Sequence, residues 1–227
     1  MLPGDPGPIY TETNLARFPV EPWNTSSNLI FLAIAIYFWR KIKLDDYRHP
    51  FVSVALPILI LGFIGGTLYH ATRNSRLWLL LDFVPIFVLG IAAAVYFWHG
   101  VTHSRWLAAL LVGAFIFISR SVIALSSLPH SARITAGYVL LAVMIILPAL
   151  LHSARHGWRN VALVLGSVLS FGGAAYFRYA DSLRLLPMGT HFIWHLLGGV
   201  STFLLMRYIY LAEIDEAARE VPLITKD

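Results

Sequence analysis

Seven long apolar runs occupy most of this chain, and they constrain its fold more than any motif does. Each run approaches the roughly 20 residues that an α-helix needs to cross the hydrocarbon core of a bilayer. The linkers are short, so we expect one compact bundle. The sequence therefore predicts an all-α polytopic membrane protein with seven transmembrane helices, at residues 26–43, 51–70, 77–98, 105–125, 133–152, 158–178 and 188–211.

The composition agrees with a lipid-embedded protein. Hydrophobic residues make up 58% of the chain and charged residues 13%, whereas charged residues make up roughly 25% of a soluble domain. The chain has no cysteine, which excludes disulfides and thiolate ligands. Its net charge of +5 does not indicate nucleic-acid binding, because basic residues of membrane proteins set topology and contact anionic headgroups.

The distribution of lysine and arginine predicts the orientation. One side of the bundle is richer in these residues, with Arg40, Lys41, Lys43 and Arg48 after the first run, Arg155 and Arg159 between the fifth and sixth runs, and Arg219 and Lys226 in the tail; the other side holds Arg17, Arg73, Arg76, Arg133 and Arg184. By the positive-inside rule, the N-terminus lies outside and the C-terminus in the cytoplasm. We expect a polar N-terminal segment at 1–25, the bundle at 26–212 and a cytoplasmic tail at 213–227. The short linkers favour a bacterial cell membrane over the endoplasmic reticulum or Golgi, and the oligomeric state is unknown.

Three histidines and an aspartate lie at the ends of apolar runs. His191 and His195 are four residues apart, which places both imidazoles on one helix face. His70 ends the second run and Asp82 lies near the start of the third. With seven spans, all four groups fall at the outer end of the bundle. Three imidazoles plus a water form the usual open zinc site of a hydrolase. The alternative is that each histidine only forms hydrogen bonds with neighbouring helices.

Other polar residues in or near the runs are not expected to bind the metal. Arg120 lies late in the fourth run, where it either extends to the outer surface or pairs with Asp181 or Glu21. The remaining histidines on the cytoplasmic side are expected to contact headgroups or solvent, and they are His49, His99, His103, His152 and His156.

Two further classes of helical membrane protein can be weighed. A retinal protein needs a Schiff-base lysine in its last helix, but the lysines here are Lys41, Lys43 and Lys226, so this class is excluded. A haem protein could use His70 and His195 as axial ligands, and a visible absorption spectrum would test that alternative.

Three patches in the chain resemble the alkaline ceramidases, a family of seven-helix membrane hydrolases in a superfamily with the adiponectin receptors. The first patch joins Glu12-Thr13-Asn14 to Glu21-Pro22-Trp23-Asn24-Thr25-Ser26-Ser27-Asn28, the second joins Gly65-Gly66-Thr67-Leu68-Tyr69-His70-Ala71-Thr72 to Leu80-Leu81-Asp82-Phe83-Val84-Pro85, and the third joins Tyr179-Ala180-Asp181 to His191-Phe192-Ile193-Trp194-His195.

The resemblance implies an intramembrane zinc amidase. Zinc would be held by His70, His191 and His195, and Asp82 would act on the attacking water. The reaction would hydrolyse the amide bond of ceramide or a related N-acyl lipid, which gives a fatty acid and an amine base. The alternative within the same superfamily is a receptor-like or lipid-binding protein with a structural zinc and little hydrolytic activity.

The resemblance also implies a calcium site in the N-terminal segment, and it has departures. Glu12, Asn14 and Glu21 match side-chain ligands of calcium, and Tyr10 matches a position that offers its backbone carbonyl. Ile9 replaces an aspartate of that site and Phe83 a glutamate after Asp82. The serine four residues before the first zinc histidine is Gly66 here. Thr67 lies on the same helix face as His70 and is the candidate to stabilise an oxyanion instead.

Overall fold

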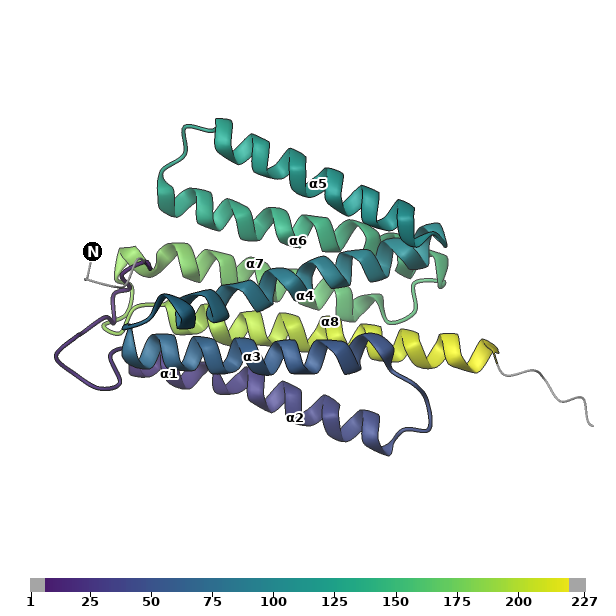
Figure 1. Ribbon diagram of the computed structural model, residues 1–227, viewed down its shortest axis with the longest axis horizontal. Helices are drawn as coiled ribbons and strands as arrows, with labels where there is room; N and C mark the ends of the chain where they lie inside the picture. Colours follow the sequence, from purple (N-terminus) through teal and green to yellow (C-terminus); the bar gives the residue numbers. More distant parts are fainter. Residues whose placement is uncertain (1–6, 221–227) are drawn as a thin grey trace, which may run out of the picture.

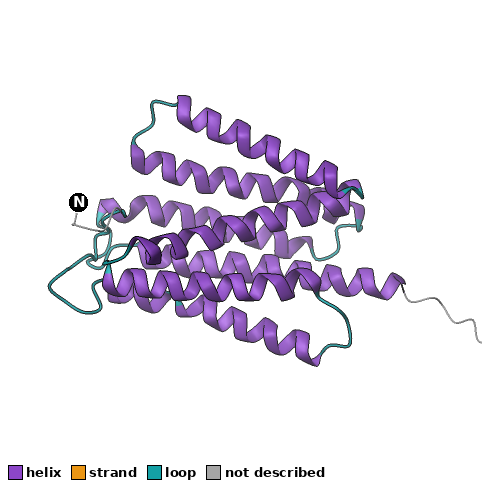
Figure 2. Ribbon diagram, in the orientation of Figure 1, coloured by secondary structure: helices purple, strands orange, loops and turns teal. Residues whose placement is uncertain are grey.

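The structure is a computed structural model that describes residues 7–220, except for the side chains of residues 130, 131, 219 and 220. Within these residues the regular structure is entirely helical, with no strand (Figures 1 and 2). The elements are α1 (Pro22–Ser27), α2 (Leu29–Leu44), α3 (Pro50–Thr72), α4 (Arg76–Thr102), α5 (Arg105–Leu125), α6 (His130–Arg155), α7 (Val161–Ala180), a 3₁₀ turn η1 (Asp181–Leu183) and α8 (His191–Glu220).

The helices confirm the predicted helical membrane bundle. Each of the seven apolar runs contains one long helix, and six of these, α3 to α8, are long and apolar enough to cross a membrane. The first run differs from expectation at its start, because residues 26 and 27 end the separate polar helix α1 and the 16-residue α2 begins at Leu29. The last helix continues to Glu220, well into the predicted tail, and the end of that tail lies outside the described residues.

The central helix is α8, which packs against α1, α2, α3 and α7. On one side of it, α4 packs between α3 and α6, and α5 forms the outer layer (Figure 1). The described chain begins at one end of the bundle and finishes at the other, because the long helices α2 to α8 alternate in direction (Figure 1). The outer surface carries apolar side chains, among them Trp106, Phe117 and Leu169. This surface is suited to lipid.

Local signals place three helix termini at one end of the bundle. Arg73 adopts a left-handed conformation that ends α3, and the Ser75 hydroxyl accepts the Leu77 N–H to begin α4. At the start of α8, the Asp181 carboxylate accepts the N–H groups of Thr190 and His191 at 2.7 and 3.0 Å. A carboxylate is favourable there because helix N-termini carry unpaired donors and a partial positive charge.

Two glycines allow helices to approach closely. A Cβ atom on Gly65 would lie 2.4 Å from the backbone carbonyl carbon of Leu81, so α3 and α4 are in contact there. A Cβ atom on Gly199 would lie 2.6 Å from the Ile30 side chain, so α8 and α2 are in close contact there. Its neighbour Gly198 has no such contact.

We predict that Gly65→Ala destabilises the bundle, because its methyl group would overlap backbone atoms that cannot rotate away. The expected cost is roughly 1–3 kcal/mol. Gly113→Ala is the matched control, since nothing lies within 4 Å of its Cβ position, and it should be neutral or gain up to about 1 kcal/mol. Denaturant unfolding in detergent measures both, and equal midpoints would contradict the α3–α4 contact.

Candidate metal centre

The three predicted histidines meet at the end of the bundle where α3 finishes and α8 begins. One ring nitrogen from each of His70, His191 and His195 lies within 4.8 Å of the others. The ring centroids of His191 and His195 are 4.7 Å apart, and that of His70 lies 4.9 Å from His195. All three residues are buried. Clustered, buried imidazoles of this kind form a site that a zinc ion would fit.

Hydrogen bonds fix which nitrogen of two histidines faces the cluster. Nδ1 of His70 lies 2.5 Å from the Glu21 carboxylate, so we assign the proton to Nδ1 and the lone pair to Nε2. Nδ1 of His195 lies 2.8 Å from the Ser27 hydroxyl and 3.2 Å from the Asn24 carbonyl oxygen. The Ser27 hydroxyl donates its own proton to that carbonyl, so both groups accept from His195 and Nδ1 carries the proton here as well. Metal-binding histidines commonly donate their second N–H to a carboxylate or a backbone carbonyl.

Two ring nitrogens in the cluster have no hydrogen-bond partner among the described residues. They are Nε2 of His70 and Nδ1 of His191, and both are buried. A buried polar atom without a hydrogen bond costs about 1–3 kcal/mol, so its presence here suits a site that receives a ligand. Tyr10 covers His191, with its ring stacked at a centroid distance of 3.7 Å. The backbone carbonyl of Tyr10 is the group expected at a calcium ion, and its side chain lies at the histidine cluster.

Glu21 is the charged group that orders this end of the structure. It is fully buried and contacts His70, the Arg73 guanidinium at 2.8 Å and the Thr13 hydroxyl at 2.5 Å. Burial alone raises the pKa of Glu21, but the hydrogen bond from His70 and the charge of Arg73 outweigh it, so the pKa lies below its usual value. The carboxylate is therefore ionised and holds the His70 imidazole in orientation.

Asp82 stands next to the cluster, as the sequence predicted. Its Oδ2 lies 4.0 Å from Nε2 of His70, and the residue lines the internal cavity. Gly66 explains how the carboxylate comes so close, because a Cβ atom there would lie 2.6 Å from Asp82 Oδ1 and 2.8 Å from Asn28 Oδ1. A serine at this position would displace one of these two groups.

Thr67, unlike Asp82, does not face the cavity. The Thr67 hydroxyl oxygen is buried without a hydrogen-bond partner among the described residues, and Thr67 does not line the cavity. The polar groups that do line it near the histidines include Asn28 and Arg178. Asn28 belongs to the first sequence patch, but its position at the cavity was not predicted. Arg178 carried one signal, a charge within an apolar run.

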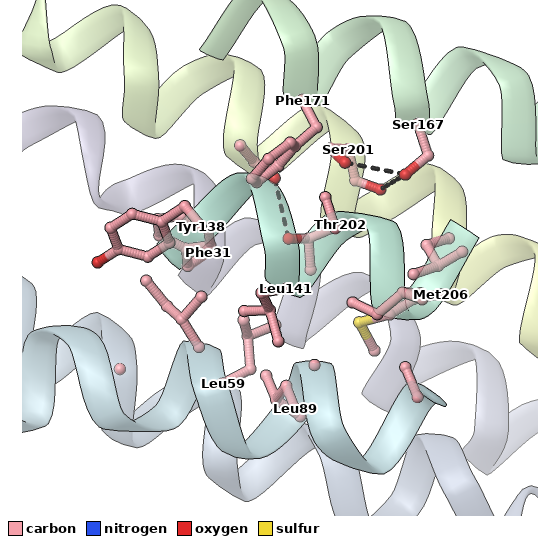
Figure 3. A pocket seen from close by; sticks show the side chains of 18 of the residues that line it. Phe31, Leu59, Leu89, Tyr138, Leu141, Ser167, Phe171, Ser201, Thr202 and Met206 are labelled. Carbon is pink, nitrogen blue, oxygen red and sulfur yellow. Dashed lines mark hydrogen bonds between the residues drawn. The ribbon is translucent and has the colours of Figure 1, made fainter. Parts of the chain in front are cut away.

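An elongated cavity runs through the bundle from the histidine cluster. It is polar at the cluster and mostly apolar beyond it, where α3, α4, α6, α7 and α8 contribute its walls. Between His191 and Ile209, which both line the cavity, α8 rises about 27 Å at ~1.5 Å per residue. Figure 3 shows Leu59, Leu89, Leu141 and Met206 around the apolar part, with a hydrogen bond between Ser167 and Ser201 at 2.8 Å.

The predicted calcium residues do not fit a calcium ion in this arrangement. The Glu12 carboxylate accepts the backbone N–H groups of Trp23 and Asn24, at 2.5 and 2.9 Å, and so caps α1. The Asn14 side chain accepts the N–H of Ala16. Glu21 is already paired with Arg73, whose guanidinium also donates to the Pro8 carbonyl at 2.7 Å. Calcium needs several oxygen ligands that are free to coordinate it. Here the oxygens of Glu12 and Asn14 accept backbone N–H groups, and the Glu21 carboxylate is paired with the Arg73 guanidinium.

The polar residues outside the cluster also depart in part from expectation. Arg120 is exposed on α5. The two carboxylates considered as its partners bind other groups: Glu21 pairs with Arg73, and Asp181 caps α8. His99 and His103 are exposed as predicted. His49 and His152 are buried, which corrects the prediction of a headgroup or solvent position.

Comparison with protein-family models and with curated proteins finds no match for this chain.

We predict that Glu21→Gln lowers zinc affinity by roughly 10–100-fold, the usual effect of losing a partner that orients a metal ligand. Glu12→Gln is the matched control, because Glu12 is also buried but its described hydrogen bonds go to α1 and not to a histidine. It should cost stability and keep zinc affinity within a few-fold. Competition with a coloured chelator measures both constants. Unchanged zinc affinity in Glu21→Gln would refute the orienting role.

We also predict that stability is insensitive to calcium and depends on Arg73. Removing calcium with EGTA should leave the unfolding midpoint unchanged. Arg73→Met should cost about 3–5 kcal/mol, since it leaves a buried carboxylate without its cation. Arg76→Met, on an exposed arginine, is the control. A midpoint that falls in EGTA would show that calcium does bind.

Proposed function

We propose that this protein is an intramembrane zinc-dependent hydrolase that cleaves the amide bond of ceramide or a related N-acyl lipid. The observation that carries the proposal is the continuity between the histidine cluster and the long apolar cavity. His191 and His195 line the polar end of that cavity, and apolar residues as far as Ile209 line the rest. This arrangement suits a substrate with a polar reacting group and a long acyl chain. The resemblance to the alkaline ceramidases supports the same substrate class.

The residues that would hold the metal are His70, His191 and His195. A bound zinc ion would supply Lewis-acid polarisation of the scissile carbonyl and a lowered pKa for water. Glu21 and the Asn24 carbonyl hold two of the imidazoles with Nε2 toward the cluster. The preorganised imidazoles would lower the cost of assembling the site when the ion binds.

Asp82 is the proposed proton acceptor. Its carboxylate lies beside the histidines and faces the cavity, where it can take a proton from the attacking water and return it to the departing amine nitrogen. Asn28 lines the same region of the cavity. One N–H of its side-chain amide donates to the Asn24 carbonyl at 3.0 Å, and the second N–H would orient the substrate carbonyl by a hydrogen bond. Tyr10 covers His191 and would limit the access of bulk water from the end of the bundle.

The proposal includes the position of the histidine cluster in the membrane. We place the histidine cluster at the outer face, with the N-terminus outside and the C-terminus in the cytoplasm of a bacterial cell. In this position an N-acyl lipid would lie with its acyl chain between the helices and its headgroup near the cluster. The products would be a fatty acid and an amine base.

A receptor-like protein with a structural zinc is the second candidate, and Gly66 favours it. The related hydrolases carry a serine at this position, whereas Asp82 and Asn28 leave no room for a Cβ atom here. An oxyanion donor would then be missing, and the histidines would serve only to join α3 to α8.

Fatty-acid release from a panel of N-acyl lipids, measured by mass spectrometry, distinguishes the two candidates. His195→Ala should abolish release, and Asp82→Asn should lower it by roughly 10²–10⁴-fold, the usual contribution of a general base. His99→Ala, on an exposed histidine away from the cluster, should retain activity.

Release that persists in both His195→Ala and Asp82→Asn would contradict the hydrolase. Stoichiometric zinc without release from any lipid would favour the receptor-like protein.

A further inference from the structure

A second group of metal-ligating side chains lies at the opposite end of the bundle from the histidine cluster. His152 and His156 stand one turn apart near the end of α6, and Glu216 lies near the end of α8. One ligand atom from each of these three residues lies within 4.8 Å of the other two. Among the described residues, this group and the first histidine cluster are the two that meet this condition.

His152 is the anchor of this second group. Its side chain is 1% exposed, and its Nδ1 lies 3.0 Å from the Tyr208 hydroxyl on α8. The other nitrogen, Nε2, is buried and has no hydrogen-bond partner among the described residues. Gly100 on α4 makes room for the ring, because a Cβ atom there would lie 2.6 Å from His152 Cδ2. The buried His152 imidazole is thus fixed in place, and its Nε2 is available to bind a ligand.

His156 has the tautomer that a metal ligand needs. Its Nδ1 lies 2.8 Å from the His152 carbonyl oxygen, which can only accept, so Nδ1 carries the proton and Nε2 has the free lone pair. The two imidazoles stack at a centroid distance of 4.2 Å. A backbone carbonyl that accepts the second N–H is a common way to fix the orientation of a metal-bound histidine.

Glu216 supplies a carboxylate on the open side of the group. Its Oε1 lies 3.8 Å from Nε2 of His152, and its side chain is 45% exposed. This separation is longer than a hydrogen bond, so Glu216 does not satisfy the buried nitrogen directly. An ion between the two groups would contact both, and the exposed side of Glu216 leaves a path for its entry.

We propose that His152, His156 and Glu216 form a second binding site for a divalent transition-metal ion of the zinc type. Two imidazoles and one carboxylate, with a fourth position open to solvent, are a common ligand set for zinc. Imidazole nitrogens are poor ligands for calcium and magnesium, because these ions prefer oxygen ligands. The bound ion would join α6 to α8 at the end of the bundle remote from the first cluster. No residue is shared between the two sites, so this site does not depend on the proposed hydrolase function.

Zinc content per chain tests the proposal directly. Protein purified in detergent is loaded with Zn²⁺, desalted and measured by mass spectrometry for metal. His156→Ala should bind one zinc fewer than wild type, and the control His99→Ala should bind the same number as wild type. Equal zinc content in His156→Ala and His99→Ala would overturn the second site, whatever the first cluster binds.

Glu216→Gln is a second variant that tests the same site in case His156→Ala does not fold. The Glu216 side chain is half-exposed, and the change keeps the shape of the residue. It should weaken zinc binding at this site by at least about tenfold, in protein that remains monodisperse on size exclusion, whereas His195→Ala should leave binding at this site unchanged. Unchanged affinity in Glu216→Gln would overturn the carboxylate's part and with it the three-ligand site.

Discussion

The buried Glu21 carboxylate determines the arrangement of one end of this protein. An isolated charge in that position would be very costly, so it must be matched by donors and cations. Its partners come from three separate parts of the chain: Thr13 in the N-terminal segment, Asn24 in α1, and both His70 and Arg73 at the end of α3. One ionised group therefore fastens the N-terminal segment over the bundle and orients a candidate metal ligand.

A second carboxylate acts in the same way on the last helix. Asp181 accepts the first N–H groups of α8 and also the N–H of Thr11 at 2.9 Å. The start of α8, which carries His191, is thereby joined to the same N-terminal segment that Glu21 holds. The two carboxylates bring α3 and α8 into a common register at their ends, and the histidine cluster follows from that register.

Much of the fold and part of the site follow from sequence alone. Apolar runs of sufficient length specify the helices, and an odd number of passes puts His70, Asp82, His191 and His195 at one end. The burial of His152 could not be predicted, because it depends on α8 and α4 lying against α6. Thr67 shares a helix face with His70, but only the packing of α3 shows that the cavity lies elsewhere. Periodicity gives the face of a helix and not its neighbour.

The division between α1 and α2 has a consequence for the surrounding bilayer. The 16 residues of α2 extend only about 24 Å at ~1.5 Å per residue, less than the roughly 30 Å of the hydrocarbon core. Ser27 and Asn24, which precede this helix, are polar and contact His195. Hydrophobic mismatch of this kind is relieved by local thinning of the bilayer. The boundary between headgroups and acyl chains would therefore dip beside α2, toward the depth at which the histidine cluster lies.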